Sequence, residues 1–128
     1  MEEWMQLKTY LIDNGYSSNE SKDWWIAKSL ASTTGWTSAY EEGVIGYDQA
    51  SNNRTGFSAF PGGMREKKSW NPDYYFNNGS RKCVWWSTVP SSGSEGYAKT
   101  IWMYYTGSTS MTDSELRKEG VSIRCVKD

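Results

Sequence analysis

Aromatic side chains must build most of the interior of this chain, because large aliphatic ones are scarce. The 128 residues include eight Trp, nine Tyr and three Phe, so aromatic residues reach 16% while all hydrophobic types together reach only 37%. The mean hydropathy is −0.77. A chain of this length forms one domain, since separate cores appear only beyond roughly 250 residues. We therefore expect a single domain over residues 1–128 whose core consists largely of rings.

Charge and hydropathy exclude several classes of partner. No apolar run reaches the roughly 20 residues of a membrane span, and the start, Met1 to Trp4, lacks the basic end and apolar stretch of a signal peptide. Fourteen basic and 15 acidic residues give a net charge of −1. Binding to a phosphate backbone needs a clustered excess of Lys and Arg. We expect a soluble chain with no nucleic-acid partner and no direct membrane insertion.

Histidine is absent from the sequence, which removes much of ordinary enzyme chemistry. Nucleophile arrangements that rely on His, His-ligated metal sites and His acid–base catalysis are all impossible in their usual forms. Any enzyme would have to run on carboxylates, Cys, Lys or Tyr. The sequence therefore predicts a protein that is not an enzyme and that has no cofactor and no metal site.

Two helices are expected in the first quarter of the chain. Apolar residues at spacings of three and four predict a helix from Glu2 to Asn14, and Gly15 supplies the left-handed residue that closes it. A second helix is expected from Ser18 or Asn19 to Ala31. From Ser32 onward frequent glycines and the lack of a sustained period indicate long, ordered loops.

The last third of the chain reads as an antiparallel sheet. Residues Cys83–Val89, Tyr97–Tyr105 and Val121–Lys127 are rich in β-branched and aromatic types, which favour strands. The stretch Thr106–Gly120 is expected to be a polar return with a short helical turn near Asp113–Arg117. The fold class is therefore α+β, with two N-terminal helices, a C-terminal sheet and a large share of loops.

Four motifs occur in order along the chain: the starting helix with Trp4, Leu7 and Leu11, the run from Thr55 to Arg65, Trp85-Trp86-Ser87-Thr88 and the ending Gly120 to Asp128. Together they resemble the motifs of one bacterial family, the Fibrobacter major paralogous domain. The run from Thr55 to Arg65 is similar to its signature Gly-Phe-Ser-Ala-Leu-Pro-Gly-Gly-x-Arg, with Phe60 in place of Leu. Trp85-Trp86-Ser87-Thr88, the ending Gly120 to Asp128 and the starting helix with Trp4, Leu7 and Leu11 also match, in order. The resemblance covers nearly the whole chain. Family members usually carry a further Cys-Pro-x-Gly-Trp-Arg-x-Pro-Thr stretch upstream, so we expect that family sequence to be missing here.

The resemblance implies a fold akin to C-type lectins and to relatives of the formylglycine-generating enzyme. It also implies a place on secreted or surface-anchored bacterial proteins, lipoproteins among them, without an established catalytic role. The motif positions have a structural interpretation: Pro and paired Gly allow a sharp turn with Phe57 and Phe60 directed inward, and adjacent Trp85 and Trp86 face opposite sides of a strand. The residues assigned to this structural motif are Gly56, Phe57, Phe60, Pro61, Gly62, Gly63, Trp85, Trp86, Arg124 and Cys125.

Cys83 and Cys125 are the only cysteines, and both lie in expected strands. A disulfide between them would stabilise the fold by roughly 4 kcal/mol if the Cα atoms lie within about 7 Å. By the resemblance, Cys125 would instead pair with an upstream Cys. A bridge and two free buried thiols both stay open, and an oxidase with a reactive cysteine pair is the one enzymatic alternative.

Asn71-Pro72-Asp73 resembles the Pro-containing calcium motif of sugar-binding C-type lectins, but no partner Trp-Asn-Asp segment accompanies it. We interpret it as a turn. The acidic pairs Glu41-Glu42 and Asp113 with Glu115 are interpreted as solvated surface rather than a glycosidase pair.

The primary hypothesis is a non-catalytic recognition domain of a bacterial surface or secreted protein. Its aromatic loops would bind a glycan or a protein ligand, because rings stack on sugars and dominate protein interfaces. Two alternatives are a structural or assembly module of a larger envelope or fibre protein and a variable receptor-binding domain. The candidate contact residues are Trp36, Tyr40, Tyr47, Trp70, Tyr74, Tyr75, Tyr104 and Tyr105.

Overall fold

The computed structural model describes residues 1–20, 22, 24–67, 73–92 and 95–125, and it is an α+β structure. Its helices are α1 (Glu2–Asp13), the single-turn α2 (Ala27–Leu30) and the 3-10 helix η1 (Gln49–Ser51). The strands are β1 (Met64–Glu66), β2 (Tyr75–Asn77), β3 (Lys82–Pro90), β4 (Tyr97–Tyr104) and β5 (Met111–Leu116). No helix of the described part is long and apolar enough to cross a membrane.

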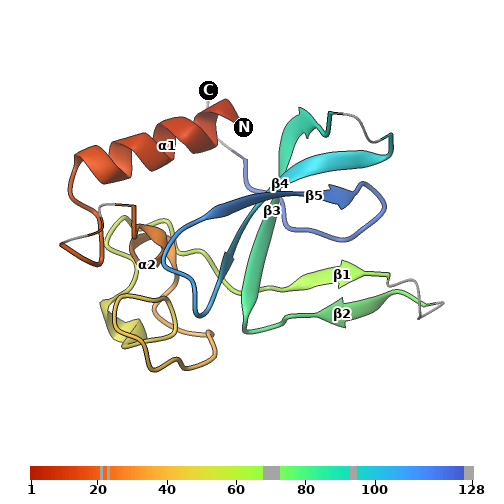
Figure 1. Ribbon diagram of the computed structural model, residues 1–128. Coiled ribbons are helices and arrows are strands. Elements are labelled where there is room, and N and C mark those ends of the chain that lie inside the picture. Colours follow the sequence, from red (N-terminus) through yellow and green to blue (C-terminus); the bar gives the residue numbers. More distant parts are fainter. Residues whose placement is uncertain (21, 23, 68–72, 93–94, 126–128) are drawn as a thin grey trace.

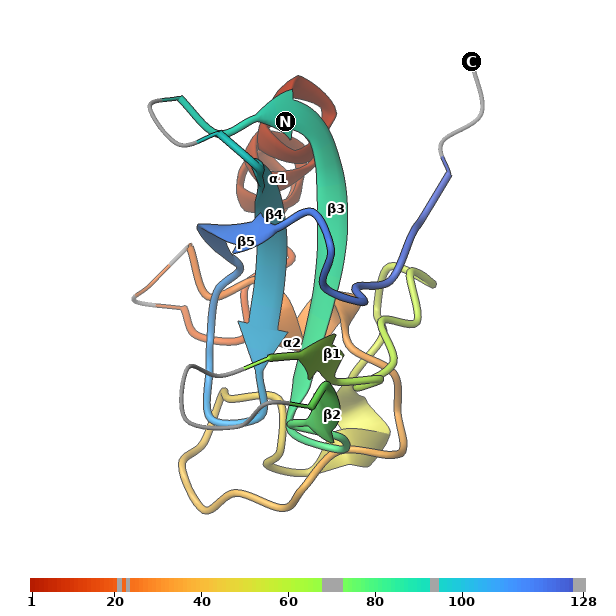
Figure 2. The same ribbon diagram turned by 90° about the vertical axis from the view of Figure 1, so that its right-hand side faces the viewer.

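Two antiparallel sheets organise these strands. The larger has the order β3-β4-β5, with Trp85 opposite Ile101 and Ile101 opposite Thr112, and the smaller pairs β1 with β2. In both views α1 lies at one end of the long strands β3 and β4, and the loops around η1 gather at the other end (Figure 1 and Figure 2). The β1–β2 hairpin projects beside these loops (Figure 1).

Helix α1 confirms the first predicted helix. Glu2 and Glu3 lie in its first turn, where negative charge is favourable. Gly15 takes a φ of +69°, and its N–H donates to the Ile12 carbonyl, so the helix closes where the sequence predicted. Leu11 is its fully buried residue.

In the described part of the second predicted helix, from Ser18 or Asn19 to Ala31, only the four residues of α2 form an α-helix, and Ser21 and Asp23 lie outside the described residues. Carbonyls of the preceding segment accept hydrogen bonds from serine hydroxyls, in addition to N–H groups of turns and of residues distant in sequence. Ser17 Oγ donates to the Lys22 carbonyl at 2.6 Å, and Ser18 Oγ lies 3.0 Å from the Trp25 carbonyl. Such bonds from side chain to backbone compete directly with helix formation.

The predicted strands at Cys83–Val89 and Tyr97–Tyr105 are confirmed as β3 and β4. The expected helical turn at Asp113–Arg117 is wrong, because Met111–Leu116 forms the edge strand β5. Its polar composition suits an edge strand, which must discourage further pairing. The Asp113 side chain also accepts the Ser114 N–H at 2.8 Å.

The expected strand Val121–Lys127 is not formed in its described part, and Val126 and Lys127 lie outside the described residues. The segment makes isolated bridges instead. Gly120 pairs with Arg65 of β1, and Ser122 pairs with Trp85 of β3. The chain end thereby links the two sheets.

The two phenylalanines of the glycine and proline motif differ in their surroundings. Phe57 packs against the core, whereas Phe60 is 61% exposed and contradicts the expectation that both point inward. The Phe60 ring lies on the backbone of Gly35, where a Cβ would come within 2.6 Å of it. Gly63 has a φ of +64°, and a Cβ there would collide with the Asn77 carbonyl, so only glycine fits.

Three rings from distant segments pack together, with Trp85 buried in the core and Trp4 and Phe57 partly buried against it. The centroids of Trp4 (α1) and Trp85 (β3) lie 5.5 Å apart, and the Phe57 ring meets Trp85 edge-on at 5.9 Å. The Arg124 guanidinium covers the outer side of Phe57 at 3.7 Å from the ring centroid. Each of the four sequence motifs therefore contributes one residue to the same cluster. Other residues of the core include Leu11, Ile26, Leu30, Ala31, Trp36, Ile45, Ala59, Cys83 and Met103.

Replacing Phe57 by Ala is expected to lower the free energy of unfolding by about 2–3 kcal/mol, because the change leaves a cavity between two tryptophans. Phe76→Ala is the matched control, since Phe76 is 72% exposed, and it should cost less than about 0.5 kcal/mol. Urea denaturation measures both. Equal losses for the two variants would contradict the central role of the ring cluster.

Candidate functional site

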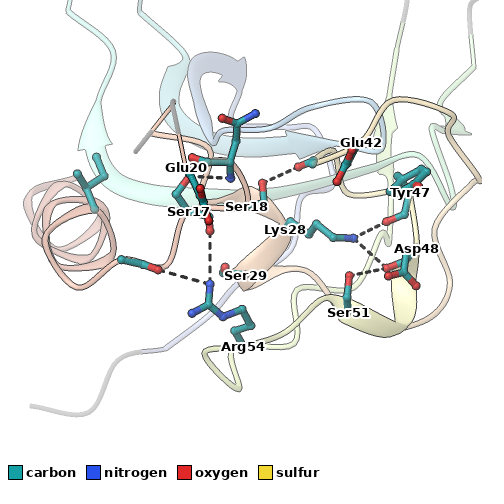
Figure 3. A pocket seen from close by; sticks show the side chains of 14 residues that line it. Ser17, Ser18, Glu20, Lys28, Ser29, Glu42, Tyr47, Asp48, Ser51 and Arg54 are labelled. Atoms are coloured by element: carbon teal, nitrogen blue, oxygen red, sulfur yellow. Dashed lines mark hydrogen bonds between the residues drawn. The ribbon is translucent and has the colours of Figure 1, made fainter.

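A hollow lies between the end of α1, α2 and the loops around η1. We call it the loop pocket, and its volume is about 690 Å³. Figure 3 shows its side chains approaching from these separate segments. Its lining consists of Ile12, Gly15, Ser17, Ser18, Asn19, Glu20, Lys28, Ser29, Glu42, Gly43, Tyr47, Asp48, Ser51 and Arg54.

A buried lysine fixes one wall of the loop pocket. Lys28 is only 7% exposed, and its ammonium donates to the carbonyls of Tyr47 and Asp48 and to Oδ1 of Asn52 at 2.8 Å. Figure 3 shows the side chain reaching across from α2 to residues 47 and 48. The amide nitrogen of Asn52 donates in turn to the carbonyls of Ser32 and Ile45, at 2.9 and 3.2 Å. The side chains of Lys28 and Asn52 therefore hold the loop around η1 in place through hydrogen bonds.

This bonding pattern assigns Lys28 a structural role. Burial lowers the pKa of its ammonium, and the nearby Asp48 carboxylate opposes that effect. An ammonium has three donors, and three acceptors occupy them here. No donor is left over for a ligand.

The rim of the pocket carries the groups that a ligand could reach. Tyr47 is 39% exposed, and Glu20, Glu42 and Asp48 are also exposed. Among the described residues, these three carboxylates have no hydrogen-bonding partner, and no group of three acidic or thiol residues is arranged to hold a metal ion. Carboxylates in this state accept hydrogen bonds from hydroxyl groups.

Arg54 forms the opposite side of the rim. Its guanidinium lies 3.4 Å from the carbonyls of Gly15 and Ser17 and 5.4 Å from the centroid of the Tyr16 ring (Figure 3). These contacts to carbonyls are long and involve only one nitrogen of the guanidinium. Its other N–H groups stay available to donate to a ligand.

A second hollow of about 610 Å³ lies over the outer face of the larger sheet. Trp102 and Tyr104 of β4 line it together with Met111 of β5 and Lys82 of β3. The Lys82 ammonium lies 4.8 Å from the Trp102 ring centroid and 4.0 Å from a Glu115 carboxylate oxygen. We call this hollow the sheet groove.

Beside the sheet groove lies a polar layer with unsatisfied atoms. Thr100 Oγ1, Trp102 Nε1 and Glu119 Oε2 are buried without a partner among the described residues. Burial raises the pKa of Glu115 to about 7; Lys82 opposes this shift and the neighbouring carboxylate of Glu119 adds to it. Ionisation of the acidic groups in this layer therefore costs free energy.

The structure places the predicted contact residues at several separate positions. Tyr47 lies on the loop pocket and Tyr104 in the sheet groove. Tyr40 is 99% exposed on the loop before Glu42. Tyr105 packs against the core, and its ring centroid lies 4.9 Å from that of Tyr104, with the two rings tilted by 57°.

Other predicted contacts serve local packing. Trp36 is 5% exposed, and its indole N–H donates to Ser32 Oγ at 3.1 Å, so it belongs to the core. Tyr74 is half-buried under the Arg65 guanidinium, 4.3 Å from its ring centroid, and Tyr75 is half-buried in β2. Trp70, Asn71 and Pro72 lie outside the described residues. The predicted contact residues thus do not converge on one surface.

Sequence reasoning missed most of the loop pocket. Its polar residues lie in stretches without a helical or strand-like hydrophobic period. The neighbouring sequence therefore did not identify Glu42, Asp48 or Arg54 as residues of a site. One signal was present in the sequence, because Lys28 interrupts a largely apolar run. The structure adds a second feature: Asp48 adopts a φ of 42°, which is uncommon for a residue other than Gly.

Both cysteines are free, so the disulfide alternative is wrong for the pair Cys83 and Cys125. Cys83 is buried, and desolvation raises the pKa of its thiol to about 12. Such a thiol is protonated at neutral pH and is a poor nucleophile. Cys125 is exposed, which contradicts the expectation of two buried thiols.

Lys28→Met is expected to destabilise the protein by about 2–3 kcal/mol, because two carbonyls and the Asn52 amide oxygen lose a buried donor. Lys118→Met, at an exposed site, is the control and should be close to neutral. Thermal or urea denaturation tests this. A neutral Lys28→Met variant would show that the loop does not depend on the ammonium.

The pKa of Glu115 predicts that stability falls as the pH rises. Its folded value of about 7 exceeds the ordinary 4.5, so the contribution is complete below about pH 4.5 and is lost toward pH 7. Glu115→Gln should remove on the order of 1 kcal/mol of this loss, after allowance for solvent screening. Urea denaturation at about pH 5 and about pH 8 measures it, with the exposed Glu41→Gln as control. An identical pH dependence in Glu115→Gln and wild type would refute the assignment.

Comparisons with known proteins gave one match. No curated protein and no solved structure matches the chain. The Fibrobacter succinogenes major domain matches residues 1–127, which is nearly the full sequence and includes all four motifs that meet at the ring cluster. The chain therefore belongs to the Fibrobacter succinogenes major domain family.

Proposed function

We propose that the chain is a non-catalytic recognition domain that binds a glycan in the loop pocket. One observation carries the proposal: an exposed tyrosine ring, three unpartnered carboxylates and an arginine surround a hollow of about 690 Å³. A volume of this order is typical of small-ligand sites.

The chemistry of the rim suits a polyhydroxylated ligand. The carboxylates of Glu42 and Asp48 can accept hydrogen bonds from sugar hydroxyls, and the Arg54 fork can donate to hydroxyl oxygens. The ring of Tyr47 offers a face for the apolar side of a sugar, with its hydroxyl directed to water. The rim thus combines a stacking surface with both donors and acceptors.

Rigidity of the pocket supports binding. Lys28 and Asn52 hold the backbone of residues 45–48 and 52, next to Tyr47 and Asp48, through buried hydrogen bonds. A binding loop that is ordered before the ligand arrives loses less conformational entropy on binding.

The non-catalytic part of the proposal rests on the state of the reactive groups. The donors of Lys28 are all engaged, and the Cys83 thiol is buried with a raised pKa. The carboxylates of the rim are exposed rather than enclosed beside a reacting atom.

We also propose a C-type-lectin-like fold and a place on a secreted or surface-anchored bacterial protein. The fold is supported by one N-terminal helix of three turns, antiparallel sheets and a long ordered loop region that carries the pocket. A structural or assembly module is the second candidate, favoured by Trp36, which serves the core rather than a surface. The variable receptor-binding domain stays a prediction.

A glycan array with the purified chain, followed by calorimetry on any hit, tests the function. Tyr47→Ala and Asp48→Asn should each weaken binding about tenfold, which corresponds to roughly 1.4 kcal/mol. Asp48→Asn keeps a residue that tolerates the left-handed backbone. Tyr40→Ala removes a ring that is more exposed than Tyr47 but lies outside the pocket, and this variant should bind like wild type.

An array that stays blank with correctly folded protein would reject the proposal. Binding that depends on Tyr40 and not on Tyr47 would move the site away from the loop pocket. Self-association or capture of an envelope protein, with no glycan bound, would favour the assembly module.

A further inference from the structure

A third hollow, of about 400 Å³, lies between α1, the segment Thr55–Phe57 and the C-terminal segment. We call it the α1 notch. Its floor is apolar, since Leu7, Leu11 and Leu30 contribute to it together with the rings of Tyr16 and Phe57. Leu11 and Leu30 are almost fully buried, so the floor is part of the core surface.

A single charged side chain, Arg124, lines this apolar hollow. Its guanidinium carbon lies 3.7 Å above the centroid of the Phe57 ring. Within the described ranges, no carboxylate, carbonyl or hydroxyl accepts a hydrogen bond from Arg124, and no acidic residue lines the α1 notch. Among the residues that the structure describes, the charge therefore has no counter-ion in the notch.

The contact with Phe57 leaves N–H groups of the Arg124 guanidinium free. A guanidinium whose carbon lies over a ring can still offer N–H groups to a carboxylate, and paired N–H groups suit a bidentate contact. Arg54 adds a second positive charge nearby, because it lies 5.4 Å from the centroid of Tyr16, another ring of the notch. The local charge is thus positive beside an apolar floor.

We propose that the α1 notch binds a carboxylate carried on a short apolar chain. The apolar chain would cover Leu7 and the rings of Tyr10, Tyr16 and Phe57, and the carboxylate would meet the guanidinium of Arg124. This chemistry differs from that of the loop pocket, whose rim is rich in carboxylates, so the two proposals stand or fall separately.

Titration of the full chain with hexanoate, followed by amide NMR shifts, tests the inference. Hexanol supplies the same apolar body without charge, and acetate supplies the charge with almost no apolar body. Hexanoate should bind at least tenfold more tightly than either and shift residues of α1 and of the segment Thr55–Phe57. N-acetyl-leucine distinguishes the source: tighter binding than hexanoate indicates a peptide C-terminus, and weaker binding indicates a fatty acid.

Arg124→Gln should weaken hexanoate binding at least tenfold, whereas Arg81→Gln, an exposed arginine outside the notch, should bind like wild type. Arg124→Met keeps apolar cover on Phe57 and serves if the first variant does not fold. Failure of both carboxylates to bind overturns the proposal. Equal affinity for hexanol and hexanoate, or unchanged affinity in a folded Arg124 variant, overturns it as well.

Discussion

The contact between Trp4, Phe57 and Trp85 holds together parts of the chain that are otherwise separate. Edge-to-face and tilted ring pairs contribute about 0.5–1.5 kcal/mol each beyond the area they bury. More important is their connectivity, because the three rings come from α1, the glycine-rich loop and β3. Arg124 adds the C-terminal segment to the same cluster. Without this cluster, α1 would have little to dock against, since Leu11 is its one fully buried residue.

Loops at the other end of the sheet are held by polar bonds in addition to apolar packing. Lys28 and Asn52 supplement the core residues Trp36 and Ile45 there with buried hydrogen bonds, and every donor of the two side chains has an acceptor. A buried charge is tolerated only with such full satisfaction. The consequence for function is a rigid pocket rim whose exposed groups are free to contact a ligand.

The three hollows differ in chemistry although they lie on one small domain. The loop pocket presents carboxylates and a ring, the sheet groove presents Trp102 and Tyr104 over a strained polar layer, and the α1 notch presents Arg124 over leucines. A recognition domain needs only one of them. The loop pocket is favoured as the main site because it is the largest of the three and because its backbone is fixed.

The sequence alone predicted the elements whose formation depends on residues close together in the chain. Helical spacing gave α1 with its stop at Gly15, β-branched and aromatic runs gave β3 and β4, and the motifs gave family membership. Tertiary structure alone decided the rest. Strand β5 forms because β4 offers it a partner, and the loop pocket forms because long-range hydrogen bonds join α2 to η1 and its neighbours. Such bonds connect residues far apart in sequence, and periodicity within a short window carries no information about them.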